Sequence, residues 1–350
     1  MSKICFQWLP SRKNRCVFPV FFGRLVGMDN NIEKKESPVL SSIWFVALAA
    51  SFCSFLWGSA TPCIKIGYAL FSIAPSDTAT VILFAGVRFF LAGILAVAVG
   101  SAMERKFLRP RSASAWGKVC VLSLFQTVVQ YFFFYGGLTR ASGVTSALTI
   151  STNVFASLLI AVFVFRQEKL SALKVVGCAV GFAGVALVNA FGSSGSDYSV
   201  SFFGEGFIFI SSICYGFSGG FSKYFSKTEN PVMLSGWQFV VGGLVMIAAG
   251  FFAGGRFSGF TAQSTALIAY LAFISACAYS LWGILLKYND VSKVVIFGFL
   301  NPVFGVVLSM IFLHEKGQNL VVVALSLALV SIGIITVNRK GESGKMKAER

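Results

Sequence analysis

Arg88 is the residue whose type and position most clearly require a chemical explanation. It lies in the stretch VILFAGVRFFLAGILAVAVG, residues 81–100, which carries no other charge. An arginine at the centre of a lipid-spanning helix costs about 2.5 to 3.5 kcal/mol on insertion scales, so such a residue faces protein or water rather than lipid. Arg88 therefore requires a polar or negatively charged partner inside the protein.

No acidic residue offers Arg88 an obvious ion pair. Of the 13 Asp and Glu residues, none lies near the middle of an apolar stretch. The remaining partners are the side-chain oxygens of Gln126, Gln130 and Asn153, free backbone carbonyls, water, or a negative group on a substrate. Arg88 either fastens its helix to a neighbour or binds a substrate carboxylate or phosphate, and the sequence leaves both interpretations open.

Further polar and aromatic residues form a stripe in FQTVVQYFFFYGG, residues 125–137. Such a stripe is typical of a pocket that stacks or hydrogen-bonds a small organic molecule, although helix packing with interfacial aromatic rings explains it equally well. Pro302 follows Asn301 in mid-helix, where proline frees a backbone carbonyl, and is therefore a candidate hinge. The candidates for lining a substrate cavity are Trp57, Arg88, Gln126, Gln130, Tyr131, Asn153, Gln238, Tyr279, Trp282 and Asn301.

Residues that catalysis or a metal centre would need are scarce. His314 is the only histidine, the eight cysteines contain no Cys-x-x-Cys pair, and no glycine-rich loop ends in Gly-Lys-Ser/Thr. Catalysis inside a membrane needs paired carboxylates, a Ser/His arrangement or metal ligands. We therefore expect no metal, no cofactor and no ATP hydrolysis, and a membrane-embedded enzyme is only a distant alternative.

These side chains must be positioned by helices that cross a membrane. The chain has 350 residues, of which 56% are hydrophobic and 12% are charged, a composition outside the range of soluble domains. A helix of about 20 apolar residues crosses a hydrocarbon core, and apolar runs of this length exclude barrel strands. The predicted spans are 43–64, 79–99, 119–139, 145–165, 172–190, 206–222, 232–252, 266–286, 294–313 and 320–337. The predicted fold class is an all-α integral membrane bundle of ten helices.

The net charge of +16 is distributed as membrane topology requires, rather than as nucleic-acid binding would require. If the helix ends alternate between the two sides, 24 of the 29 Lys and Arg residues fall on one side. This predicts a multi-pass protein of the cell (inner) membrane whose arm 1–42 and basic tail 339–350 are cytoplasmic, with the linker 191–205 outside. Residues 1–27 are not part of the native protein if translation starts at Met28.

Residues 43–190 and 206–338 are predicted to form two related units of five helices. The matching stretches are WGSATPCIK with YGFSGGFSK, AGVRFFLAG with SGWQFVVGG, YGGLTRASGV with WGILLKYNDV, and FRQEK with FLHEK. They place Gln238 opposite Arg88. Because five is an odd number, the second unit enters the membrane inverted, and inverted repeats of this kind are found in many transporters whose substrate site lies near the midplane.

The motifs FLWGSATPCIK, VRFFLAG, YGGLTRASGVTSAL and FLNPVFGVVLSMIFLHEK resemble the drug/metabolite transporter superfamily, with two EamA-type domains. The resemblance covers about residues 43–338. It implies ten helices, cytoplasmic termini and a central cavity lined mainly by helices 1, 3, 4, 6, 8 and 9. Phe155 departs from the family pattern, because many members carry a proline there that matches Pro302. The resemblance therefore leaves open whether the fourth span is kinked.

The resemblance and the inverted repeats together imply a secondary transporter. It would move a small metabolite, such as an amino acid, a related compound or a drug-like molecule, by alternating access, with export as the expected direction. The alternative is an exchanger or uptake transporter of a nucleotide-like metabolite such as S-adenosylmethionine, whose base the aromatic stripe would stack. The expected partners are a small-molecule substrate and the lipid bilayer, and the sequence leaves the coupling and the oligomeric state open.

Overall fold

The structure of the protein is a computed structural model that describes residues 39–141, 143–191, 201–256, 258–313 and 320–339. Within these residues the chain forms helices and turns, and no strand occurs. The arm before residue 39, most of the linker 191–205 and the tail after residue 339 lie outside the described residues. The alternative start at Met28 lies outside them as well.

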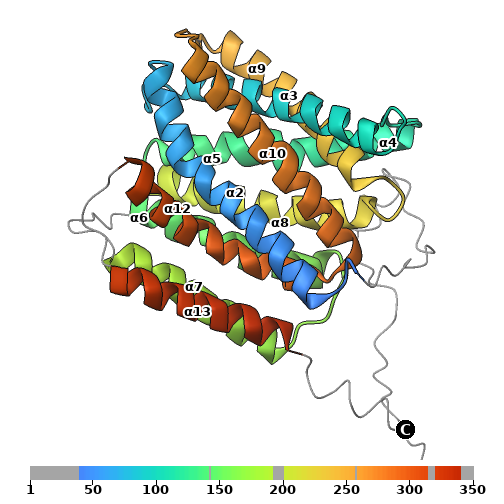
Figure 1. The fold of residues 1–350 in the computed structure, drawn as a ribbon, viewed down its shortest axis with the longest axis vertical. Helices are drawn as coiled ribbons and strands as arrows, with labels where there is room; N and C mark the ends of the chain where they lie inside the picture. The colour runs from blue at the N-terminus through green and yellow to red at the C-terminus, as the bar shows by residue number, and fades with distance from the viewer. Residues whose placement is uncertain (1–38, 142, 192–200, 257, 314–319, 340–350) are drawn as a thin grey trace, which may run out of the picture.

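The described residues form ten consecutive helical segments, some of which contain short π-helical or 3-10 turns (Figure 1). In chain order they are α2 (Ile43–Leu70), α3 (Thr78–Met103), α4 (Ala113–Ser123) with η1 (Leu124–Val129) and α5 (Gln130–Leu138), α6 (Gly143–Leu159) with η2 (Ile160–Val164), α7 (Ala172–Phe191), η3 (Phe202–Gly206) with α8 (Phe207–Phe225), α9 (Pro231–Phe252), α10 (Ala262–Tyr288), α11 (Val291–Val295) with η4 (Ile296–Phe299) and α12 (Leu300–Leu313), and α13 (Leu320–Asn338). Each segment overlaps one predicted span, so the all-helical fold class is confirmed.

Seven of the described segments are long and apolar enough to cross a membrane by length and composition. Helices α6 and α7 contain shorter apolar stretches, Thr149–Val164 and Ala172–Leu187. Helix α8 is 19 residues long, but its many serines and glycines make it more polar, and most of them are buried. Small residues of this kind let membrane helices approach closely, so α8 is a helix of the bundle interior.

Polar residues define where several helices begin. Asp77 accepts a hydrogen bond from the backbone N–H of Thr80 (3.1 Å) at the start of α3, and Asn230 accepts two from the first turn of α9 (2.8 and 3.1 Å). These bonds satisfy N–H groups that a helix leaves free. Helix α2 continues to Leu70, beyond the predicted end at residue 64. The predicted span ends there because only stretches without charged residues count as spans. An exposed lysine such as Lys65 can extend its charge into water and does not interrupt the helix.

Helices α3 and α9 correspond in the two repeats and form the most extensive helix pairing of the described bundle. The close contacts along this crossing are Gly86 with Ile247, Gly93 with Val240, and Gly100 with Val232. Residue numbers rise along α3 while they fall along α9, so the two helices run antiparallel. Corresponding helices are antiparallel when one repeat is inverted relative to the other.

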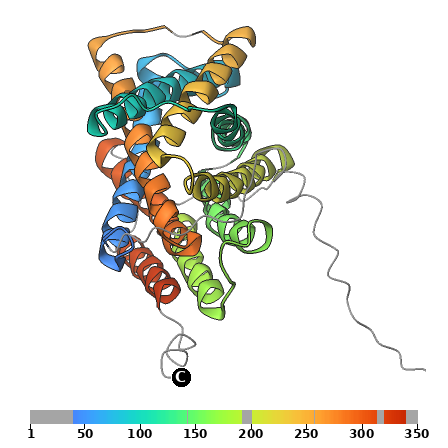
Figure 2. The same cartoon turned by 90° about the vertical axis from the view of Figure 1, so that its right-hand side faces the viewer.

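The second pair of corresponding helices, α7 and α13, is also antiparallel. Gly177 contacts Val337, and Gly184 contacts Val330. Figures 1 and 2 show this pair at one edge of the bundle and the α3/α9 pair at the other edge, with the remaining helices between them. The two repeats therefore interlock along their whole width and do not form separate bodies.

The ninth span changes its helix type before Pro302, and not at it. The 3-10 turn η4 ends at Phe299, and Pro302 lies in the first turn of α12, where its missing N–H leaves no helical bond broken. The matching residue of the fourth span, Phe155, lies within the uninterrupted helix α6 and packs its ring against Phe182 and Phe299, at centroid distances of 5.7 and 6.1 Å. The two spans thus differ where the sequences differ.

Helix α2 begins and helix α13 ends at the same end of the bundle, which we call the termini end (Figure 1). The ion pairs found among the described residues all lie there: Lys106 with Glu104, Lys118 with Glu229, Lys174 with Glu168, Lys223 with Asp290, and Lys293 with Asp290. Glu168 also accepts hydrogen bonds from the backbone N–H (2.9 Å) and the hydroxyl (2.5 Å) of Ser292. Polar bonds therefore join the two repeats at this end.

Candidate functional site

Aromatic rings from α2, α3, α5, α9 and α10 meet in one continuous cluster. Trp57 contacts Tyr279 and Trp282 edge to face, at centroid distances of 5.1 and 4.9 Å. Tyr131 contacts Phe89 at 4.4 Å. Together with their polar neighbours these residues form what we call the central cluster: Trp57, Arg88, Phe89, Gln130, Tyr131, Tyr135, Phe239, Tyr279 and Trp282.

Phe89 and Phe239 lie at the middle of the central cluster and occupy corresponding positions in the two repeats. Their rings are fully buried and stacked, with centroids 5.1 Å apart and an interplanar angle of 1°. Tyr131 contacts the first ring and Tyr279 the second, at 5.0 Å, and the two tyrosine hydroxyls share a hydrogen bond of 2.9 Å. The central cluster thus lies where the two repeats meet.

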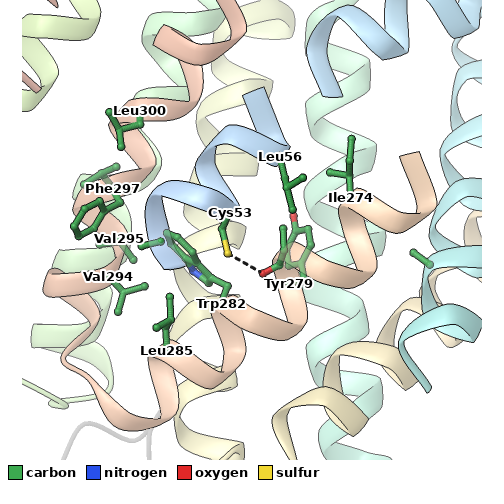
Figure 3. Packing of buried hydrophobic residues seen from close by; sticks show 14 of the residues in the cluster. Cys53, Leu56, Ile274, Tyr279, Trp282, Leu285, Val294, Val295, Phe297 and Leu300 are labelled. Atoms are coloured by element: carbon green, nitrogen blue, oxygen red, sulfur yellow. Dashed lines mark hydrogen bonds between the residues drawn. The ribbon is translucent and has the colours of Figure 1, made fainter. Parts of the chain in front are cut away.

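Helix α10 presents its part of the central cluster to α2. Figure 3 shows Tyr279 and Trp282 facing Cys53 and Leu56, all within the buried apolar core. The Cys53 thiol donates to the backbone carbonyl of Ala278, with 3.5 Å between sulfur and oxygen. This packing fixes the rings, because a dense interior leaves little freedom to change rotamers.

Arg88 is buried in the central cluster, with 4% of its surface exposed. Its guanidinium carbon lies 4.4 Å from the centroid of the Phe89 ring, and the guanidinium is hydrogen-bonded to the phenol of Tyr131. Among the described residues no carboxylate forms an ion pair with Arg88, and its Nε has no hydrogen-bond partner. The Arg88 cation is therefore in contact with aromatic rings and phenol groups. These groups are neutral and do not cancel its charge.

Several other buried polar atoms of the candidate residues and of the central cluster also have no partner among the described residues. They are Trp57 Nε1, Gln130 Oε1, Tyr135 Oη, Gln238 Nε2 and Asn301 Oδ1. A buried polar atom without a partner destabilises a fold by about 1 to 3 kcal/mol, so native proteins rarely leave such atoms together. Unpartnered buried donors and acceptors of this kind are typical of a site that binds a polar molecule.

Gln238 occupies the position in α9 that corresponds to Arg88 in α3. It is fully buried, and its Oε1 accepts a hydrogen bond of 2.6 Å from the hydroxyl of Thr127 on η1. The second repeat therefore places a neutral, partly bonded amide where the first repeat places a cation. Gln238 adjoins the central cluster through its neighbour Phe239.

The remaining predicted site residues lie around the central cluster. Gln126 is buried on η1, and Asn153 is half-buried on α6, where no hydrogen bond within the described residues joins it to the cluster. Asn301 lies on α12 against Gly58, the residue after Trp57, because its carbonyl oxygen would be 3.2 Å from a Cβ at that glycine. The structure thus brings together predicted residues of α2, α3, α5 and α10, and the roles of Gln126 and Asn153 stay predictions.

Three residues of the central cluster were not among the candidates from the sequence: Phe89, Tyr135 and Phe239. The repeat contains a signal for two of them, because the match of VRFF with WQFV places Phe89 opposite Phe239 next to the Arg88/Gln238 pair. Apolar rings in an apolar span carry no signal of their own. Their role appears only once the helix rotation is known.

Residues that could hold a metal ion do not gather anywhere in the described part of the chain, where no group of three His, Cys, Asp or Glu side chains occurs. The six described cysteines are free, and Cys53, Cys178 and Cys214 are buried. The central cluster offers one cation, several hydrogen-bonding groups and flat ring surfaces, which are groups that bind small organic molecules.

Comparison with known proteins agrees with this architecture. The model of the EamA-like transporter family matches residues 43–190 and 202–337. Similar proteins include the uncharacterized transporter YvbV of Bacillus subtilis, 27% identical over 302 residues, with 85% of this chain and 93% of YvbV covered. The uncharacterized inner membrane transporter YedA of Escherichia coli is 26% identical over 304 residues, with 84% of this chain and 91% of YedA covered.

A plant protein and a solved structure extend the comparison. A WAT1-related chloroplastic protein of Arabidopsis thaliana is 25% identical over 316 residues, with 87% of this chain and 73% of that protein covered. A crystal structure shares the fold with a TM-score of 0.66 at 16% identity, and covers 84% of this chain and 97% of that one. With a family match over two successive segments that span almost all of the described helices, the chain belongs to the EamA-like transporter family.

Proposed function

We propose that this membrane protein is a secondary transporter that carries a small organic metabolite through the central cluster by alternating access. The observation that supports this most strongly is the group of unpartnered buried polar atoms among stacked rings, where two antiparallel repeats meet. Substrate sites of inverted-repeat transporters lie near the midplane between the repeats. A molecule bound there would supply the missing hydrogen bonds.

Alternating access requires two conformations of similar energy, which two inverted repeats provide. In the described conformation, polar bonds join the two repeats at the termini end, through Lys118 with Glu229 and through Glu168 with Ser292. We propose that these bonds break when the protein opens toward that end. Glu168 is the more important of the two carboxylates, because it binds Ser292 at the start of α11 and Lys174 at the start of α7 simultaneously.

The cellular location and the orientation of the protein are part of the same proposal. YedA is named an inner membrane transporter, and 24 of the 29 basic residues of this chain fall on the side that contains the termini end if the spans alternate. We therefore propose that the protein lies in the inner (cell) membrane with the termini end facing the cytoplasm.

Transport by the full chain in proteoliposomes tests the proposal. Vesicles would be loaded with a mixture of amino acids, organic acids, nucleosides, S-adenosylmethionine and drug-like cations, and protein-dependent efflux and uptake of each would be followed by mass spectrometry. We expect protein-dependent movement of at least one compound, reduced about tenfold by the double substitution Trp57→Ala and Trp282→Ala.

The matched control is Trp44→Ala, because Trp44 lies on the same helix α2 as Trp57 but is 77% exposed on its outer surface. It should transport like the unmodified protein. Equal effects of the two tryptophan changes would contradict a substrate path through the central cluster.

A further inference from the structure

Buried cations elsewhere in this protein are paired with carboxylates. Lys118 lies 2.8 Å from Glu229, and Lys174 lies 2.6 Å from Glu168, with their lysine side chains 11% and 14% exposed. Lys223, 7% exposed, donates to the carbonyl of Asn289 (2.6 Å) and lies 4.0 Å from Asp290. Each of these three lysines thus lies beside a carboxylate.

Arg88 differs from these lysines, since it is at least as buried and forms no ion pair with a carboxylate among the described residues. The described carboxylates lie at or beyond the helix ends: Asp77, Glu104, Glu168, Glu205, Glu229 and Asp290. Phenol groups are neutral, so the tyrosines around Arg88 solvate the guanidinium without cancelling its charge. A buried charge left in this way is strongly unfavourable unless something else supplies the opposite charge.

The geometry of the guanidinium indicates which side is open. Its carbon atom lies over the Phe89 ring, 4.4 Å from the centroid, and a cation in that place still needs hydrogen-bond acceptors for its N–H groups. Nε has no partner among the described residues. A carboxylate binds arginine in the guanidinium plane through two parallel N–H···O bonds, and one of the edges that it uses includes Nε.

We infer that the missing counter-ion is a carboxylate of the substrate, so that this site takes small organic acids whose body is aromatic or apolar. This inference rests on the proposed function and specifies its substrate class. The carboxylate binds the Nε edge of Arg88, and the rings of Trp57, Trp282 and Tyr279 contact the apolar body. A cationic drug, or the sulfonium of S-adenosylmethionine, would meet the Arg88 charge with no carboxylate of the described spans to offset it.

Three compounds of equal size separate charge from shape: phenylpropanoate, phenylpropanol and phenylpropylamine. Binding of each to the purified full chain would be measured by calorimetry, and transport of each in proteoliposomes. We expect phenylpropanoate to bind about ten- to one-hundred-fold more tightly than the alcohol, because a charge-assisted bond replaces a neutral one, and the amine to bind most weakly.

The substitution Arg88→Lys keeps the charge but removes the planar pair of donors. It should weaken phenylpropanoate binding about tenfold or more and leave phenylpropanol binding unchanged, whereas Arg109→Lys, at an exposed arginine outside the spans, should change neither. If the Arg88 variant does not fold, the preference of the unmodified protein among the three compounds still decides the question.

Equal binding of acid and alcohol, preference for the amine, or binding of none of the three by a protein that transports other compounds would overturn the inference and leave the transport proposal standing. Tight binding of the acid without transport of any compound would have the opposite result: it would support the anion site and contradict the proposed function.

Discussion

The two repeats of this protein are alike in their packing and different at one pair of residues in its centre. At the α3/α9 crossing, Gly93 approaches the backbone of Val240, and the matching Gly243 approaches the backbone of Phe90. Close to this symmetric contact, Arg88 is an unpaired cation and Gln238 is a neutral amide bonded to Thr127. We infer that the symmetric glycines support the packing of the fold, whereas the replacement of Arg88 by Gln238 in the second repeat confines the positive charge of the proposed site to the first repeat.

The largest effect on stability is expected at the symmetric glycines of the α3/α9 crossing. A Cβ at Gly93 would lie 2.5 Å from the backbone nitrogen of Val240, and one at Gly243 would lie 2.5 Å from that of Phe90. Backbone cannot move aside as a side chain can, so Gly93→Ala and Gly243→Ala should each destabilise the protein by about 3 kcal/mol or prevent its assembly. Thermal unfolding and monodispersity in detergent measure this.

The control for these glycines is Gly219→Ala in α8, where a Cβ would meet nothing within 4 Å. It should be neutral or slightly stabilising, because alanine favours a helix over glycine by up to about 1 kcal/mol. A large difference between the Gly93 and Gly243 variants would contradict the symmetry of the crossing.

Substitutions at Arg88 and at Gln238 should change the stability of the ligand-free protein in opposite directions. Arg88→Gln removes an uncompensated buried charge, so the ligand-free protein should be as stable or more stable by about 1 kcal/mol, while the stabilisation by a bound organic acid disappears. Gln238→Leu should instead lower the stability by about 1 to 3 kcal/mol, because it leaves the Thr127 hydroxyl without its acceptor, and should retain the response to ligand. Thermal unfolding with and without phenylpropanoate distinguishes the two, and equal behaviour of the two variants would refute the division of roles.

A smaller effect is expected at the termini end, where the repeats are held together. Glu168→Gln loses the ion pair with Lys174 and weakens the bonds to Ser292, so it should favour opening of this end by about 1.4 kcal/mol, which is tenfold in equilibrium. A cysteine introduced at the buried Val295 would report this opening, because a thiol reagent should label it about tenfold faster. Mass spectrometry would quantify the labelling at that residue.

The matched control is Glu104→Gln, because Glu104 pairs with Lys106 and accepts a bond from Asn230 of the other repeat (2.6 Å) at the same end, but these contacts are exposed, with Glu104 and Lys106 at 37% and 55%. Exposed pairs of this kind contribute little, so labelling should stay within about twofold of the unmodified protein. Unchanged labelling in the Glu168 variant as well would argue against the closing role of this carboxylate.

The smallest effect concerns the first turns of the two corresponding helices, where Asp77 begins α3 and Asn230 begins α9. Hydrogen bonds from Thr80 lower the pKa of Asp77 below its usual 3.8. Its contribution to stability is therefore fully present above that value and is lost as the pH falls through the lowered pKa. Asp77→Asn should remove this dependence and make the two caps alike, while Asp77→Ala should cost about 1 kcal/mol.

Unfolding temperatures of the unmodified protein and of Asp77→Asn, measured between about pH 3 and 7, provide the test. The difference between them should shrink toward acid pH. A difference that grows as the pH falls would have the wrong sign for this cap.

The sequence alone predicts much of the fold and less of the site. Apolar runs and the repeat predict ten helices, because lipid allows few alternatives for a backbone. Helix ends such as Leu70 are missed, since a charged residue near a membrane surface does not end a helix. Within the site, Arg88 is conspicuous by its charge, but Phe89 and Phe239 are chemically indistinguishable from the lipid-facing phenylalanines.

The most direct measurement is an experimental structure of the full chain with phenylpropanoate bound. We expect the carboxylate in the plane of the Arg88 guanidinium, with one oxygen about 2.8 Å from Nε, and the phenyl ring among Trp57, Trp282 and Tyr279. Phenylpropanoate bound elsewhere, with a backbone carbonyl or a protein carboxylate occupying the Nε edge, would contradict it.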